Sequence, residues 1–87
     1  MESHISIFKA LGDESRLRIV SFLSDVGEAS CSDISGVIDG LSQPTLSHHF
    51  KVLHEAGIID VRKEGVSCYY ILNKKRLKEM GVDTAKL

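Results

Sequence analysis

The feature that most constrains the fold is the stretch SQPTLSHHFKVLHEAGII, residues 42–59, which predicts a capped helix followed directly by a strand. Ser42 is a favoured N-cap residue, and Pro44 falls in the first turn, where its missing N–H costs no helical hydrogen bond. Gly57 marks the helix end. Three apolar residues recur at helical spacing and share one face: Leu46, Phe50 and Leu53. We therefore expect an amphipathic helix over about 42–56 that packs on a core.

Three shorter helices are expected before this stretch. Apolar periodicity indicates a helix over residues 3–11, which ends near Gly12, and a second over 14–24 with Asp13 as its N-cap. Ser30 and Asp33 stand three residues apart, as in a capping box, and open a third helix. Its expected apolar face consists of Ile34, Val37, Ile38 and Leu41.

A β-hairpin and a last helix follow. Residues 58–62 predict one strand, Glu64 and Gly65 a turn, and residues 66–72 a second strand, because apolar side chains alternate there. The apolar face of the second strand holds Val66, Cys68, Tyr70 and Leu72. Residues 73–87 indicate a short amphipathic helix. The order helix, helix, helix, helix, strand, strand, helix is mainly α with a β-hairpin wing, and it predicts a single winged helix-turn-helix domain over residues 1–87.

The histidines of the fourth helix do not form a metal site. His48 and His49 lie ~100° apart around the helix axis, and His54 lies ~140° and ~240° further round, so no pair shares a face. Ser47 and His48 are sequence neighbours, which point in different directions on a helix and do not make a nucleophile–base pair. We therefore expect neither an enzyme nor a bound cofactor.

The exposed side of the same helix is suited to DNA. Its first turns carry polar side chains and no acid before Glu55, as a helix entering the major groove requires. The residues expected to contact bases are Gln43, Thr45, Ser47 and His48. Lys51, with Arg62 and Lys63 of the hairpin, is expected to contact phosphate. An ordinary solvated face is the alternative, as is a winged-helix module that binds a protein instead of DNA.

Charge is distributed unevenly along the chain. The net charge is −1, yet residues 42–87 hold eight basic and five acidic residues, against three and seven in residues 1–41. A nearly neutral protein can thus present a basic face to nucleic acid. No apolar run is long enough for a membrane span, no secretory signal is evident and two cysteines are too few for a disulfide scaffold. The expected location is the cytoplasm.

Three segments together resemble the ArsR/SmtB family of winged-helix repressors: FKALGDESRLRIVSFL, LSQPTLSHHFKVLHEAGII and VRKEGVSCYYIL. The resemblance implies a homodimeric transcriptional repressor that binds a palindromic operator and releases it on binding a metal or another inducer. It further implies a recognition helix at about 42–56, a wing at about 58–72, and dimerisation through helices at about 3–11 and 73–85.

The chain departs from two ligand sets of that family. Arsenic-type members open the third helix with Cys-Val-Cys-Asp, and aligning Asp33 with that Asp puts Ser30 and Ser32 at the thiol positions. Zinc-type members carry Asp, His and Glu ligands on the last helix, whereas residues 73–87 contain no His or Cys. The resemblance therefore leaves the inducer open.

Two interpretations of the cysteines remain. Cys31 and Cys68 can both be small hydrophobes that pack in the core. Alternatively, in winged-helix folds the stretch before the third helix often pairs with the second wing strand, which would bring residues 29–31 beside Cys68. The two thiols could then form a redox-responsive or metal-responsive site.

Overall fold

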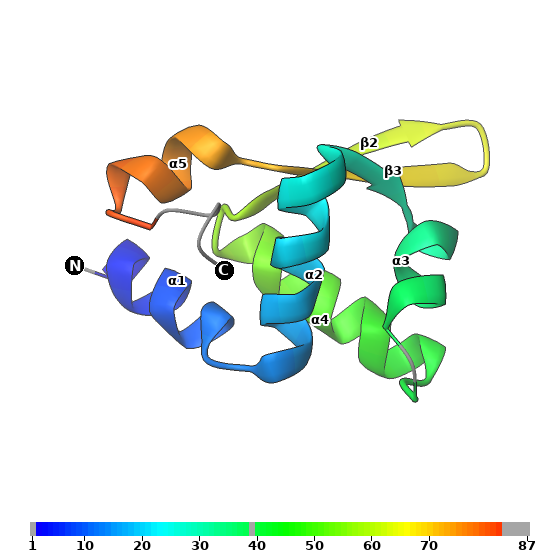
Figure 1. Ribbon diagram of the computed structural model, residues 1–87, viewed down its shortest axis with the longest axis horizontal. Helices are drawn as coiled ribbons and strands as arrows, with labels where there is room; N and C mark the ends of the chain where they lie inside the picture. Colours follow the sequence, from blue (N-terminus) through cyan, green and yellow to red (C-terminus); the bar gives the residue numbers. More distant parts are fainter. Residues whose placement is uncertain (1, 39, 83–87) are drawn as a thin grey trace.

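The computed structural model describes residues 2–38 and 40–82, and their side chains from residue 7 onward. Figure 1 shows the helices and strands of the chain. In order they are α1 Glu2–Leu11, α2 Glu14–Val26, β1 Glu28–Ser30, α3 Cys31–Val37, α4 Gln43–Glu55, β2 Ile59–Glu64, β3 Ser67–Leu72 and α5 Lys74–Glu79. The winged helix-turn-helix prediction is confirmed, with the β2–β3 hairpin as the wing.

Short polar side chains begin the helices where the sequence predicts. The hydroxyl of Ser30 accepts the Asp33 N–H at 3.1 Å, and the Asp33 carboxylate accepts the Ser30 N–H at 3.2 Å, which completes a capping box. Asp13 and Ser42 accept a backbone N–H three residues ahead, at the starts of α2 and α4. Three helix starts are therefore fixed by local chemistry.

A three-stranded antiparallel sheet has the order β1-β3-β2. The strand β1 is absent from the predicted element order, because three residues are too short to show an alternating pattern. It pairs Ser30 with Tyr69, so the pairing assumed for the two-thiol site is present. On the other edge, Ile59 pairs with Leu72 at the base of the hairpin.

The hairpin tip differs from the prediction at Val66. We expected this side chain on the apolar face with Cys68, but it is fully exposed, at 105% of its reference area. The strand begins only at Ser67, and the turn is formed by Gly65, with a φ of 60°, and Val66. Val66 therefore lies outside the alternation that orients the strand.

The core lies between the sheet and the helices. Its largest fully buried side chains are Ile7, Ile19, Val20, Leu23, Ile34, Leu53, Ile58, Ile59 and Leu77. The ring of Phe50 stacks on Tyr70 at 4.1 Å between centroids, which joins α4 to the wing. Val37 was expected on the apolar face of α3 but is 49% exposed, because α3 ends at this residue and only its Ile34 and Ile38 side packs inward.

The helices predicted to form a dimer interface, α1 and α5, lie at the same end of the molecule (Figure 1). The last helix, α5, spans Lys74–Glu79. Its N-cap residue is Asn73, whose side chain accepts the Arg76 N–H. The helix is shorter than the predicted 73–85, and residues 83–85 of that prediction lie outside the described part of the chain.

Candidate nucleic-acid interface

The two sides of α4 divide as the periodicity predicts, with one addition. Leu46, Phe50 and Leu53 are buried, and so is His49, whose side chain was not assigned to the core. Position 49 lies three residues after Leu46 and four before Leu53, so the same stripe could have revealed it. The opposite side of α4, from Gln43 to Lys51, is exposed and contains no acid.

The four residues predicted to contact bases are all exposed in the first two turns of α4. Gln43 reaches back to the Ser35 hydroxyl of α3, with Nε2 and Oγ 3.5 Å apart. The Thr45 hydroxyl accepts from Ser42 at 2.9 Å, so it takes part in the helix cap. Ser47 and His48 extend into solvent. The structure thus leaves all four predicted residues exposed near the start of α4, and the base contacts themselves stay a prediction.

Arg16 of α2 holds three helices together. Its Nε donates to the Ala10 carbonyl at 2.7 Å and its NH2 to the Lys9 carbonyl at 3.5 Å, which caps the end of α1. Its NH1 lies 3.3 Å from Nδ1 of His49 in α4. Because a guanidinium only donates, Nδ1 accepts and the His49 proton resides on Nε2. The backbone N–H of Arg16 also holds the pKa of Asp13 below its ordinary value.

Arg76 of α5 acts in a similar way at the other end of α4. Its Nε donates to the carbonyl of Ala56, the C-cap residue of α4, at 3.3 Å. Gly57, which follows, has a φ of 77° and turns the chain into β2. Sequence reasoning identified the glycine but neither arginine, because both contacts join segments that are distant in the sequence.

The residues predicted to contact phosphate have different surroundings. Lys51 is exposed on α4, with its ammonium 3.9 Å from Glu55. Arg62 donates to Glu28 of β1 and, at 2.6 Å, to Glu64, and it lies over the Tyr69 ring. These contacts, with Glu64 the larger cause, raise the pKa of Arg62. Phosphate contact by Arg62 would have to displace two carboxylates.

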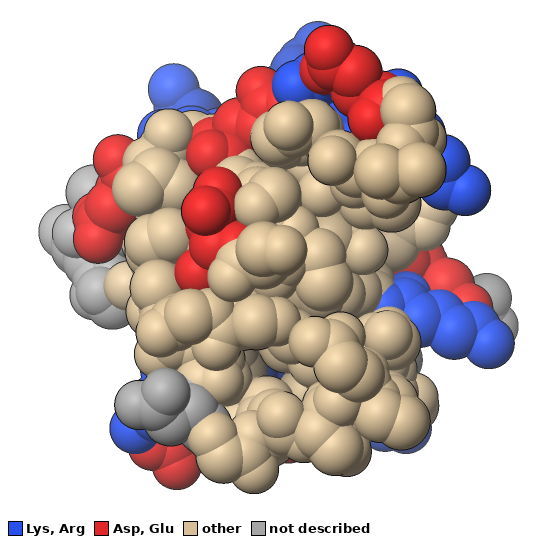
Figure 2. Space-filling model, turned by 90° about the vertical axis from the view of Figure 1, so that its right-hand side faces the viewer, with Lys and Arg blue, Asp and Glu red and all other residues tan. Residues whose placement is uncertain are grey.

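Lys63 follows Arg62 on β2 and is exposed. Figure 2 shows the end of the molecule that carries α3 and the hairpin tip. Acidic side chains gather over its upper part, most Lys and Arg side chains lie at its rim, and the surface between is uncharged. Among the described residues in this view, no broad basic surface covers this end.

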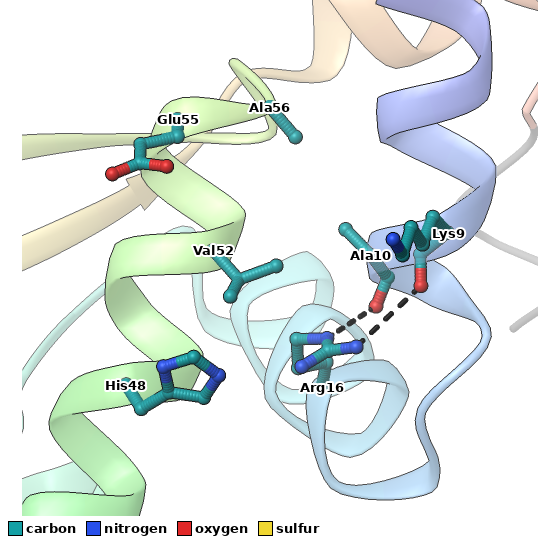
Figure 3. A pocket seen from close by; sticks show the side chains of 7 residues that line it. All are labelled: Lys9, Ala10, Arg16, His48, Val52, Glu55 and Ala56. Atoms are coloured by element: carbon teal, nitrogen blue, oxygen red, sulfur yellow. Dashed lines mark hydrogen bonds between the residues drawn. The ribbon is translucent and has the colours of Figure 1, made fainter.

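Two grooves flank α4. The first, of about 520 Å³, separates α4 from α1 and is lined by Lys9, Ala10, Arg16, His48, Val52, Glu55 and Ala56. Figure 3 shows His48, Val52 and Arg16 directed towards one another across it, with the Glu55 carboxylate turned away from α1. The second, of about 230 Å³, separates α4 from the wing and is lined by Ser47, Phe50, Lys51, His54, Val61 and Tyr70.

The cysteines are both free and half-buried. The ladder between β1 and β3 ends at Ser30, which pairs with Tyr69; Cys31 follows as the first residue of α3, and Cys68 is the residue before Tyr69 on β3. Burial raises the pKa of Tyr70, and both cysteines contribute to the rise. Among residues 2–38 and 40–82, three or more His, Cys, Asp or Glu side chains nowhere gather in a way that could hold a metal ion. In the same residues, no helix is long and apolar enough to cross a membrane.

The helix-turn-helix formed by α3 and α4, followed by a hairpin, defines the protein as a winged helix-turn-helix protein. Comparison with known proteins gives its family. Residues 13–61 match the model of bacterial regulatory proteins of the arsR family, so the chain belongs to the arsR family of DNA-binding transcriptional regulators. The resemblance drawn from the three sequence segments is confirmed.

Individual relatives agree with this assignment. An uncharacterized HTH-type transcriptional regulator of Methanocaldococcus jannaschii is 42% identical, over 91% of this chain and 88% of its own length. The arsenical resistance operon repressor of Escherichia coli is 42% identical over 79% of this chain, which spans 58% of that repressor. A homodimeric winged helix-turn-helix DNA-binding domain from Mycobacterium bovis, solved by NMR, has a TM-score of 0.78 at 25% identity, covering 92% of this chain and 73% of the other.

Proposed function

We propose that the protein is a homodimeric repressor that binds a palindromic operator through α4. The observation that carries this proposal is the exposed, acid-free and polar side of α4 between Gln43 and Lys51, opposite a fully packed face. Side chains near the N-terminus of such a helix reach base edges in the major groove. Repression is the activity named for the Escherichia coli relative.

Dimerisation supplies the second half of the site. The similar Mycobacterium bovis domain is a homodimer. In this chain Phe8 of α1 is 57% exposed, at the end of the molecule that α1 shares with α5, and a large apolar side chain there suits a partner subunit. Two copies of α4 related by a twofold axis would enter successive major grooves ~34 Å apart.

Selection of bound sites from random duplex DNA tests this function. We expect two inverted half-sites whose centres lie ~10 base pairs apart. Replacing Ser47 or His48 by alanine should relax the preference at one base pair per half-site, with a loss of about 1–3 kcal/mol on the selected site and little on random DNA. The matched control is Ser21→Ala on α2, which should leave the selected sequence unchanged.

Sedimentation equilibrium then measures how many subunits bind each selected duplex. Two subunits per selected duplex are expected. A protein that enriches no sequence, or that remains a monomer on DNA, would contradict the proposal, and the first outcome would favour a winged-helix module that binds a protein partner.

The register of β1 and β3 favours a second candidate function, a thiol-dependent control of DNA binding. Cys31 directly follows Ser30, the last residue of β1 paired with β3, and Cys68 directly precedes Tyr69, the partner of Ser30, so both thiols stand beside the same end of the ladder. A disulfide requires Cα atoms about 4.4–6.8 Å apart. Oxidation would join the two sulfur atoms and release two protons and two electrons to an oxidant such as diamide. The bond would tie the wing to the start of α3 and so change the position of the wing beside α4.

Thiol titration tests this function. Diamide should remove both free thiols of the wild type, shift its mass by the loss of two hydrogen atoms, and lower its affinity for the selected operator. The variants Cys31→Ser and Cys68→Ser should keep full affinity after the same treatment. Two titratable thiols in the diamide-treated wild type would show that the cysteines form no disulfide and serve only as small packed side chains.

A further inference from the structure

We infer that the two grooves flanking α4 receive the two phosphodiester backbones that border the DNA major groove. The inference rests on the proposed function, and it assigns DNA contacts to residues that the sequence did not indicate. These are Lys9 and Arg16 on the α1 side, and His54 and Tyr70 on the wing side.

The dimensions of the two partners support this assignment. An α-helix with its side chains is ~10–12 Å across and the major groove is ~12 Å wide, so a helix that enters the groove meets a phosphate backbone on each flank. On α4, the residues lining the two grooves are centred ~120° apart around the axis, on either side of an exposed ridge. The ridge would face the bases while each flank faces one strand.

The groove beside α1 offers positive charge and free donors. Lys9 is exposed at its edge, and Arg16 lines it from α2. A guanidinium has five N–H groups, and three of them are directed at Lys9, Ala10 and His49. Two donors therefore remain for a phosphate oxygen. The Glu55 carboxylate, which would repel phosphate, is turned away from Lys9 and Arg16 (Figure 3).

The groove beside the wing offers donors without an acid among its lining residues. Lys51 and His54 stand three residues apart on α4, and Tyr70 faces them from β3. The Tyr70 ring stacks on Phe50, which fixes the position of this side chain along the groove it lines. This wall accounts for phosphate contact on the wing side without Arg62, which is held by Glu28 and Glu64.

Salt-dependent binding separates the two grooves. Lys9→Gln should lower the slope of log K against log salt concentration by about 0.9, because one counterion fewer is released, and should weaken binding to operator and random DNA alike. Tyr70→Phe removes one neutral donor, so we expect a loss of about three- to ten-fold with an unchanged slope. The matched control is Arg18→Gln on α2, an exposed residue that lines neither groove and should change neither quantity. Circular dichroism confirms that each variant is folded.

Methylphosphonate substitution locates the contacts on the DNA. Neutralising single phosphates of the selected operator should weaken wild-type binding at two clusters, one on each strand across the major groove. Lys9→Gln should reduce the sensitivity of one cluster, and Tyr70→Phe that of the other, because Arg16 and Lys51 remain in the two grooves. Wild-type affinity in both variants, or loss of the same cluster in both, would overturn the inference while DNA binding by the wild type stands. A wild type that binds no duplex would instead overturn the proposed function.

Discussion

Replacing Arg16 by methionine is expected to lower the free energy of unfolding by about 2–3 kcal/mol. Methionine keeps much of the aliphatic volume but loses every donor. The carbonyls of Lys9 and Ala10 then lack their cap, and the Nδ1 atom of buried His49 loses its donor. Hydrogen bonds to a charged group contribute more than neutral ones, and a buried acceptor without a partner adds a desolvation cost.

Urea unfolding followed by circular dichroism measures this loss. Arg18→Met is the matched control, because Arg18 lies on the same helix and makes one exposed ion pair with Glu14. Such pairs contribute about 0–1 kcal/mol, so the control should cost well under half as much. Equal losses in the two variants would show that Arg16 acts only through helix propensity or net charge, and not by joining α1 to α4.

Much of the fold could be predicted from the sequence, because its determinants are local. The capping residues Asp13, Ser30 and Ser42 each bind a backbone N–H three residues ahead, which spacing alone reveals. The apolar stripe of α4 likewise follows from the helix period. The sequence alone therefore predicts the α4 surface on which the expected base contacts lie.

The contacts that position this surface could not be predicted in the same way. Arg16 and His49 are 33 residues apart, and the pairing of their side chains depends on how α2 packs against α4. In the hairpin, the sequence predicts phosphate contact by Arg62, because Glu28 is distant in the sequence. In the structure, β1 places the Glu28 carboxylate within hydrogen-bonding distance of the Arg62 guanidinium. The sheet order reveals Glu28 as a second acidic partner, in addition to Glu64 two residues along the same strand. The sequence pattern thus predicts which surface is polar. Which charged side chains on it are already held in ion pairs depends on the fold.

Replacing Gly57 by alanine should be among the most damaging small changes in the chain, with an expected cost of about 2–3 kcal/mol. Two causes add. The φ of 77° is unfavourable for any residue with a Cβ atom, and an added Cβ would lie 2.4 Å from Nε of Arg76. The arginine must then move away, which breaks its hydrogen bond to the Ala56 carbonyl at the end of α4.

Gly65→Ala separates these two causes. Gly65 also has a positive φ, of 60°, but an added Cβ there would meet nothing within 4 Å, so this variant carries only the backbone cost of about 1–2 kcal/mol. In a background of Arg76→Ala, the cost of Gly57→Ala should fall to the same level. If Gly57→Ala and Gly65→Ala cost the same in the wild-type background, Arg76 does not hold the end of α4. If Gly57→Ala costs more than Gly65→Ala, Arg76 of α5 holds the junction between α4 and β2. Changes in α5 can then alter the position of α4 through the hydrogen bond from Arg76 to the Ala56 carbonyl.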